Sequence, residues 1–122
     1  KPFDNENWDL KEDGIYVDII DGEPLFCSIH KYDSGSVWSS FYQTIDKSNI
    51  KESSDLKLGY ERTELKSKKS NSHLGHLFND GPKTGLRYCI NSASLKFIPK
   101  SKMISEGYEA LLYLFNEEND DI

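Results

Sequence analysis

Hydrophobic and polar positions form short runs along this chain, a pattern typical of β-strands rather than of long helices. The runs Ile15–Ile20 and Glu23–Phe26 flank Asp21-Gly22, a pair that favours a two-residue hairpin turn. The run Leu86–Ile98 predicts the strongest strand, and Pro99 ends it. We therefore expect a mostly β protein with antiparallel strands.

The remaining patterns are weaker and predict short strands separated by loops. Residues 58–67 carry β-favouring Tyr and Thr, and they predict a strand. Residues 70–85 are rich in Gly, Asn, Asp and Ser, so they predict a loop that holds one short strand, 74–78. Residues 31–40 are turn-rich and residues 46–57 are polar, and we expect both to be surface loops.

Short helices are expected toward both ends of the chain. Asp4 has the side chain of a helix N-cap, and the helix would continue to Leu10. Residues 101–106 precede a glycine and predict a helical turn, whereas the acidic residues 116–122 predict a disordered tail. We find no repeat or linker, so residues 1–122 are expected to form one domain, mostly antiparallel β with small peripheral helices.

Composition narrows the classes of function. The net charge of −6 argues against non-specific binding to nucleic acid, which needs clustered Lys and Arg. No apolar stretch is long enough for a membrane helix. The two cysteines lie far apart without a C-x-x-C pair, which argues against a secreted disulfide framework and against a structural zinc site. We therefore expect a monomer in the cytoplasm, away from membranes.

One strand face brings together residues that could carry chemistry. Alternation along residues 86–91 places the apolar side chains on one face and Arg87, Cys89 and Asn91 on the other. A guanidinium beside a thiol favours the reactive thiolate, and an Asn side chain can hydrogen-bond a polar ligand. Two interpretations of Cys89 stay open at this point: a structural thiol, which is the usual state of a strand cysteine, and a nucleophile.

A second polar group comes shortly before this strand, where His73 and His76 precede Asp80. A histidine held by a carboxylate can deliver a proton near neutral pH, and an H-x-x-H pair with an aspartate could also bind zinc. The third interpretation is two loop histidines that hydrogen-bond the backbone. Trp38, in the turn-rich loop, is either a core anchor or the wall of an apolar subsite.

Two long motifs resemble a known family. The segments SHLGHLFNDGP (72–82) and GLRYCINSASLKFIP (85–99) are similar to the signature of the B-type methionine sulfoxide reductases, which reduce the R epimer of methionine sulfoxide. Shorter matches extend the resemblance over nearly the whole chain: GIYVD (14–18), GEPLF (22–26), KYDSG (31–35) and EGY (106–108). The resemblance implies two twisted antiparallel sheets in one domain and a role in protein repair under oxidative stress.

The resemblance also implies a role for each candidate residue. Cys89 matches the catalytic cysteine, which attacks the sulfoxide sulfur and becomes a sulfenic acid. His76 matches the proton donor to the sulfoxide oxygen, and His73 matches its companion. Trp38 matches the tryptophan that receives the methyl group of the substrate. Three further positions match residues that organise the site: Asp80, Arg87 and Asn91.

The chain departs from the family where the nucleophile would be regenerated. Ser36 stands where many members have the resolving cysteine, and the C-x-x-C pairs that hold zinc in many members are missing, so we expect no metal or other cofactor. Cys27 is the only other thiol, which makes it the candidate to form a disulfide with Cys89 for thioredoxin to reduce. The alternative is direct reduction of the sulfenic acid by an external thiol.

The sequence thus favours an enzyme that acts on oxidised proteins or peptides and uses thioredoxin or another thiol. Two other functions stay open. The changed loop around Trp38 allows a catalytically weakened relative that binds oxidised methionine segments. A small zinc-binding module is the third possibility, and the missing cysteine pairs disfavour it.

Overall fold

The structure is a computed structural model that describes residues 12–35, 38–56, 59 and 61–116. The helix predicted from Asp4 and the predicted tail beyond Asn116 lie outside these residues. The strands are β1 (Gly14–Asp18), β2 (Pro24–Cys27), β3 (Lys31–Tyr32), β4 (Ser39–Phe41), β5 (Ile50–Asp55), β6 (Arg62–Ser67), β7 (His73–Phe78), β8 (Arg87–Ile90) and β9 (Leu95–Pro99). The helices are 3₁₀ turns: η2 (Ser28–His30), η3 (Lys47–Asn49), η4 (Ser92–Ser94), η5 (Lys100–Lys102) and η6 (Glu109–Phe115).

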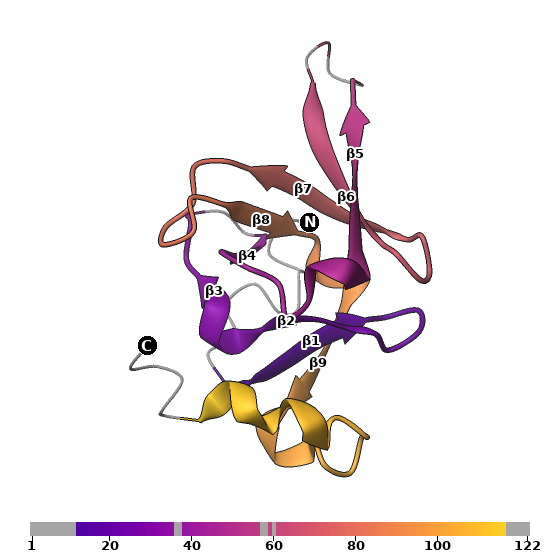
Figure 1. The fold of residues 1–122 in the computed structure, drawn as a ribbon, viewed down its shortest axis with the longest axis vertical. Helices are drawn as coiled ribbons and strands as arrows, with labels where there is room; N and C mark the ends of the chain where they lie inside the picture. The colour runs from indigo at the N-terminus through magenta and orange to yellow at the C-terminus, as the bar shows by residue number, and fades with distance from the viewer. Residues whose placement is uncertain (1–11, 36–37, 57–58, 60, 117–122) are drawn as a thin grey trace.

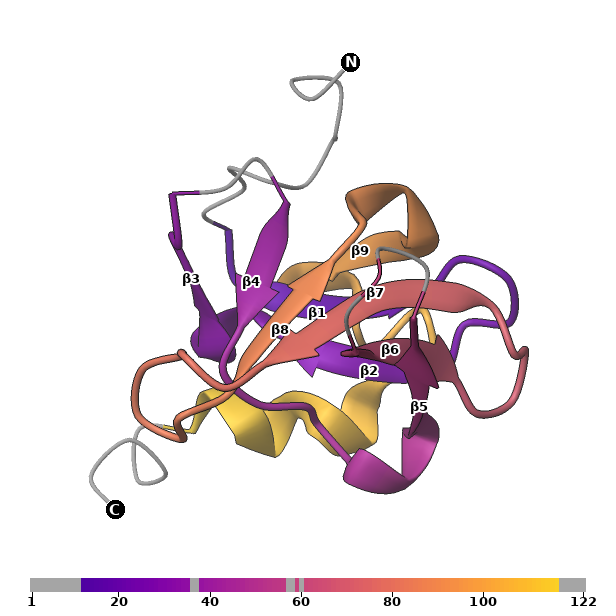
Figure 2. The same ribbon diagram turned by 90° about the horizontal axis from the view of Figure 1, so that it is seen from above.

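The strands form two antiparallel sheets (Figure 1), which confirms the predicted fold class. The smaller sheet has the order β2-β1-β9, and the larger has the order β3-β4-β8-β7-β6-β5. Seen from above, β8 and β7 cross over β1 and β2 (Figure 2). The β5–β6 hairpin projects from the rest of the molecule (Figure 1), so one end of the larger sheet is not covered by the smaller one.

Aromatic side chains fill the space between the two sheets. Phe26 of the smaller sheet stacks on Phe41 of the larger one, with ring centroids 4.5 Å apart, and the Tyr16 ring meets Phe41 edge-on at 5.2 Å. The C-terminal 3₁₀ helices cover the opposite face of the smaller sheet (Figure 1). A second cluster of buried residues includes side chains from this sheet and from the C-terminal segment: Ile15, Val17, Cys27, Ile98, Met103 and Leu114. The smaller sheet is therefore buried on both faces.

The predicted hairpin is present, but its predicted two-residue turn is wrong. β1 and β2 pair antiparallel, and residues 19–23 connect them in a wider loop. Asp18 ends β1 because its carboxylate accepts the Ile20 amide at 2.9 Å and the Ser70 hydroxyl at 2.6 Å. Ser70 belongs to the turn between β6 and β7, so this carboxylate also joins the two sheets.

The prediction of one long strand over residues 86–98 is also wrong. The chain leaves the larger sheet after Ile90, makes the turn η4, and enters the smaller sheet as β9. Asn91 causes the break, because its side-chain oxygen accepts the Ala93 amide at 3.0 Å and so caps η4. The two halves of the hydrophobic run therefore supply strands to different sheets.

Two segments predicted to be loops contain strands in the structure. The polar stretch 46–57 contains β5, and the turn-rich stretch 31–40 contains β3 and the start of β4. The strand predicted at 74–78 is confirmed as β7, and the one predicted at 58–67 begins later, as β6. The expected helical turn near residue 101 is present as η5, while η6 was not predicted.

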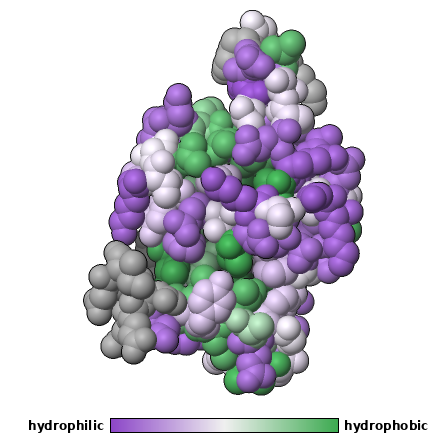
Figure 3. Space-filling view, in the orientation of Figure 1, coloured by the Kyte–Doolittle hydropathy of each residue, from purple (hydrophilic) through white to green (hydrophobic). Residues whose placement is uncertain are grey.

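The face of the molecule drawn in Figure 3 is mainly polar. Hydrophilic side chains cover much of the face drawn in Figure 3, and hydrophobic ones show in smaller groups between them. Within the described residues, we find no helix with the length and apolar character needed to cross a membrane.

The Asp18 contact predicts how stability depends on pH. Burial opposes ionisation of Asp18, but hydrogen bonds from Ser70 and the Ile20 amide outweigh it and hold its pKa below the ordinary 3.8. A carboxyl with a lower pKa in the folded state stabilises the fold above its unfolded pKa, and this contribution is lost as the pH falls through the folded pKa. We expect Asp18→Asn to lose less stability than the native chain between about pH 5 and pH 2 in chemical denaturation. The exposed Glu106→Gln is the matched control, and an equal pH dependence in all three proteins would contradict this account.

Candidate active site

The two candidate catalytic groups, Cys89 and His76, lie opposite each other on adjacent strands. β7 and β8 pair so that His76 is in register with Cys89. The register continues in both directions and gives one cross-strand row on a single sheet face: Tyr32, Ser40, Cys89, His76, Glu64 and Ser53. Tyr88 and Ile90 point to the opposite face, into the core, as alternation predicts. The row therefore occupies the face of the larger sheet that points away from the core.

A β-bulge puts both histidines on this face. Residues three apart in a regular strand point to opposite faces, but the pairing of β6 with β7 shifts at Leu74, which adds one residue to β7. The rings of His73 and His76 consequently lie side by side, with centroids 5.5 Å apart. Gly75 is needed here, because a Cβ at this position would overlap the carbonyl oxygen of Cys89.

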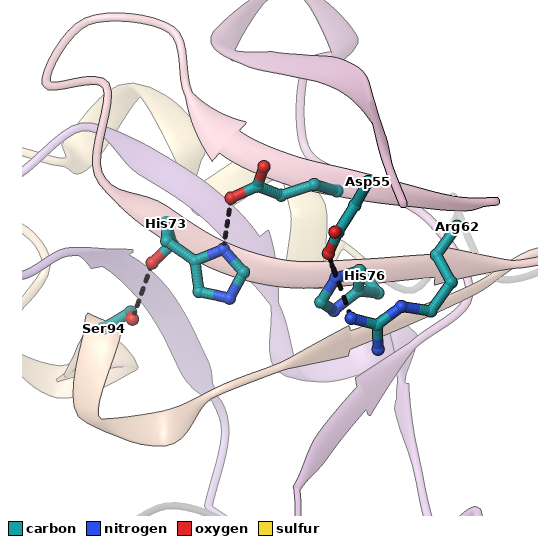
Figure 4. Close-up of polar contacts among 6 residues, drawn as sticks. Asp55, Arg62, His73, His76 and Ser94 are labelled. Atoms are coloured by element: carbon teal, nitrogen blue, oxygen red, sulfur yellow. Dashed lines mark hydrogen bonds and ion pairs between the residues drawn. The ribbon is translucent and has the colours of Figure 1, made fainter. Parts of the chain in front are cut away.

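Each histidine has a carboxylate partner (Figure 4). His73 Nδ1 lies 2.7 Å from Glu64 Oε2, and His76 Nε2 lies 2.9 Å from Asp55 Oδ2. Asp55 Oδ2 also accepts a hydrogen bond from the Arg62 guanidinium at 3.0 Å. The first pair is open to solvent, since the His73 side chain is 45% exposed, whereas the Asp55 side chain is only 6% exposed.

Arg87, two residues before Cys89, forms a bidentate ion pair with Asp80. Arg87 Nε donates to Asp80 Oδ1 at 2.8 Å, and a terminal nitrogen donates to Oδ2 at 3.2 Å. The guanidinium also stacks over the Phe78 ring at 4.2 Å from its centroid. Asp80 therefore orients Arg87, and the part of Asp80 in the reaction stays a prediction.

Burial and charge compete at the Cys89 thiol. Burial raises its pKa above the ordinary 9.0, and the Arg87 guanidinium opposes that shift without reversing it. The predicted effect of Arg87 is therefore present but is smaller than the effect of burial. The net effect on Cys89 therefore favours the thiol over the thiolate.

The end of the row beyond Cys89 carries an aromatic side chain. Burial raises the pKa of the Tyr32 hydroxyl, on which the charges of Arg87, Asp80 and Cys89 also act. That hydroxyl is buried and finds no hydrogen-bond partner among the described residues. Trp38 lies two positions before Ser40, the neighbour of Cys89, and is 36% exposed. Ser36, which replaces the usual cysteine, lies outside the described residues.

Asn91, one of the predicted site residues, lies differently from the expectation. Asn91 follows β8 instead of continuing it. Its backbone N–H donates to the Leu74 carbonyl at 2.9 Å, and its side-chain oxygen caps η4. The strand alternation that placed its side chain beside Cys89 ends at Ile90. Asn91 thus binds the bulged residue of β7 and caps η4, and its part in the reaction stays a prediction.

Cys27 and Cys89 lie on opposite sides of the core. Cys27 is fully buried in the cluster beneath the smaller sheet, and burial raises its pKa to about 11. Cys89 faces outward from the larger sheet, and the aromatic core lies between the two. Packed sheets lie about 10 Å apart, whereas a disulfide needs Cα atoms at roughly 4.4–6.8 Å. Both thiols are free in this structure.

The histidines are not arranged as metal ligands. In the part of the chain that the structure describes, no group of three or more His, Cys, Asp or Glu side chains could hold a metal ion. Asp80, which the sequence offered as a third ligand to the histidine pair, is bound to Arg87.

Sequence reasoning missed three residues of this site: Asp55, Arg62 and Glu64. Arg62 and Glu64 lie two residues apart in a segment predicted to be a strand, so alternation alone could have placed them on one polar face. Asp55 gave no such signal, because it ends a polar stretch that predicted a loop. A cavity of about 380 Å³ adjoins this end of the sheet, lined by Glu61, Arg62, Thr63, Leu77, Phe78, Asn79 and Leu86.

Comparisons with known proteins agree with this geometry. The SelR domain family matches residues 1–99 of the chain. A protein of Vibrio cholerae serotype O1 named peptide methionine sulfoxide reductase MsrA/MsrB is 58% identical over 116 residues, which is 94% of this chain. The match covers 31% of that protein, so the chain spans about a third of the length of its curated relative.

The competition at Cys89 predicts its reactivity toward iodoacetamide. We expect the alkylation rate to rise with pH to a midpoint above 9.0, and Arg87→Gln to move the midpoint higher, because the guanidinium favours the thiolate. At pH 8, Arg87→Gln should be alkylated at least about threefold more slowly than the native chain. Peptide mass mapping assigns the alkylated cysteine. Lys96→Gln, an exposed lysine of the other sheet, is the matched control, and identical pH profiles for Arg87→Gln and the native chain would refute the assignment.

Proposed function

The chain belongs to the SelR domain family, and from this we propose that it reduces methionine R-sulfoxide to methionine with Cys89 as the nucleophile. The family resemblance of the sequence to B-type methionine sulfoxide reductases supports the same proposal. The observation that carries it is the register of Cys89 with His76 on a polar sheet face. A thiol that can donate electrons and an imidazole that can donate a proton thereby face one another.

The first step reduces the substrate and oxidises Cys89. Cys89 Sγ attacks the sulfoxide sulfur and bonds to it, while His76 protonates the sulfoxide oxygen, which is otherwise a poor leaving group, so that the S–O bond breaks and the oxygen departs as water. Water then attacks Cys89 Sγ and breaks the new S–S bond, methionine leaves with the two electrons of that bond, and Cys89 remains as the sulfenic acid. General acid help of this kind contributes about 100- to 10,000-fold. Trp38, exposed beside Ser40, would receive the methyl group of the substrate.

The second step returns Cys89 to the thiol. One external thiol attacks the sulfenic sulfur and releases water, and a second thiol reduces the resulting mixed disulfide. We favour this route over a disulfide with Cys27, because Cys27 is buried on the far side of the core and its raised pKa disfavours the attacking thiolate. Thioredoxin or a small thiol would supply the electrons, and no resident cofactor is needed.

The substrates proposed for this site are oxidised proteins or peptides that carry methionine R-sulfoxide. The site lies on an outward-facing sheet surface with Trp38 exposed, which supports access by a peptide segment. We propose that the domain works as a monomer in the cytoplasm, in the repair of oxidised proteins.

The first test of this function separates the two epimers of a blocked methionine sulfoxide, with dithiothreitol as the reductant. We expect the chain to consume the R epimer alone and Cys89→Ser to consume neither, because serine cannot donate the two electrons. Chromatography of the remaining sulfoxide measures both epimers. Consumption of neither epimer by the native chain would remove the enzyme claim and leave a protein that binds oxidised methionine segments.

The second test concerns regeneration. We expect Cys27→Ala to keep turnover with dithiothreitol within about twofold of the native rate, although the smaller side chain will lower stability by about 1 kcal/mol. Steady-state kinetics measure the rate, and circular dichroism confirms that the variant is folded. A folded Cys27→Ala protein that completes a single turnover and then stops would restore the Cys27 route.

A further inference from the structure

Asp55 is an unexpected buried charge. It ends β5, a strand whose preceding residues are exposed or only half-buried, yet its own side chain is 6% exposed. An ionised carboxylate that leaves water needs partners that replace its hydration. Among the described residues, Asp55 Oδ2 contacts such partners in the Arg62 guanidinium at 3.0 Å and His76 Nε2 at 2.9 Å.

The chemistry of these partners determines which nitrogen of His76 carries hydrogen. An ionised carboxylate only accepts hydrogen bonds, and a guanidinium only donates them. If Nε2 carried no hydrogen, its lone pair would face and repel a lone pair of the Asp55 oxygen. Nε2 must therefore carry a hydrogen. This holds for the neutral ring and for the imidazolium alike. The proton that His76 gains and loses is therefore the one on Nδ1.

The other edge of the ring is available for that exchange. The hydrogen bond that the His76 ring makes within the described residues runs through Nε2, and the His76 side chain is 16% exposed. His73 cannot take over this role in the same way, because its own Nδ1 lies 2.7 Å from Glu64 Oε2. The two histidines thus use opposite ring nitrogens for their carboxylates, and they differ in the nitrogen left for other contacts (Figure 4).

We propose that Asp55 is a positioning residue that holds His76 in the Nε2–H form and turns Nδ1 toward the sulfoxide oxygen. The proposal rests on the proposed function, in which His76 is the proton donor. Asp55 does not touch the substrate, and it acts through the ring that it orients. Arg62 donates to the same oxygen of Asp55 and so helps to fix the carboxylate, which means that the hairpin β5–β6 serves the site although it carries neither the thiol nor the imidazole.

The first measurement uses the native chain and does not depend on activity. Ring ¹⁵N NMR at a pH where His76 is neutral should show a protonated Nε2 and a bare Nδ1. A neutral His76 with hydrogen on Nδ1 would overturn the proposal even if the chain reduces the R epimer. A chain that shows the Nε2–H form but reduces neither epimer would instead contradict the proposed function.

The second measurement uses Asp55→Asn, whose amide can donate to Nε2 and so favours the wrong tautomer. The corresponding carboxylate-to-amide change in the catalytic triad of serine proteases lowers kcat about 10⁴-fold. In metal sites, mutating the hydrogen-bond partner of a metal-binding histidine lowers metal affinity or activity about 10- to 100-fold. We expect kcat for the R epimer to fall at least about 10-fold with KM little changed. The ring nitrogen signals should report loss of the pure Nε2–H form.

Controls separate positioning from a general loss of structure. Glu52→Gln removes one carboxylate from an exposed position of the same strand and should change neither kcat nor the ring signals. In a His76→Asn background, Asp55→Asn should lower kcat by less than about twofold, because a residue that acts through His76 has nothing left to orient. Equal effects in both backgrounds would overturn the proposal. If Asp55→Asn does not fold, since it leaves the Arg62 charge unpaired, the native NMR measurement still decides.

Discussion

The pairing of β7 with β8 is the constraint on which the proposed site depends. Gly75 allows the two backbones to approach closely beside the Cys89 carbonyl, and the register of the pair then sets His76 opposite Cys89. The bulge at Leu74 adds the residue that brings His73 to the same face, and the Asn91 amide holds the Leu74 carbonyl in place. Backbone geometry, more than any single side-chain contact, assembles the reacting groups.

The electrostatics of the site suit a nucleophile that is activated by its substrate rather than at rest. Burial keeps Cys89 as a thiol, and the charge of Arg87 is partly offset by Asp80. A resting thiol is protected from non-specific oxidation, because the thiolate is the species that oxidants attack. The proposed proton donor has a similar arrangement, since His76 is held by a carboxylate that is itself held by Arg62. Each reacting group therefore has an ion pair beside it.

Much of the fold and the centre of the site could be predicted from the sequence. Alternation around Cys89 correctly separated Tyr88 and Ile90 from the thiol, because one face of β8 is buried in the core. The same reasoning failed at Asn91, where a local side-chain hydrogen bond ends the strand. It also failed for β5, because a strand with neither face buried has no hydrophobic period to detect. Asp55 was missed for that reason, since its burial comes from partners on neighbouring strands.

The most direct test of the account is a single turnover with methionine R-sulfoxide in the absence of any reductant. The account predicts one methionine per chain, a Cys89 peptide that carries one added oxygen and reacts with dimedone, and a free Cys27. Mass spectrometry of the digested protein measures all three. A Cys27–Cys89 disulfide would contradict the proposed regeneration by an external thiol. An unmodified Cys89 after methionine has formed would contradict the central claim that this residue is oxidised.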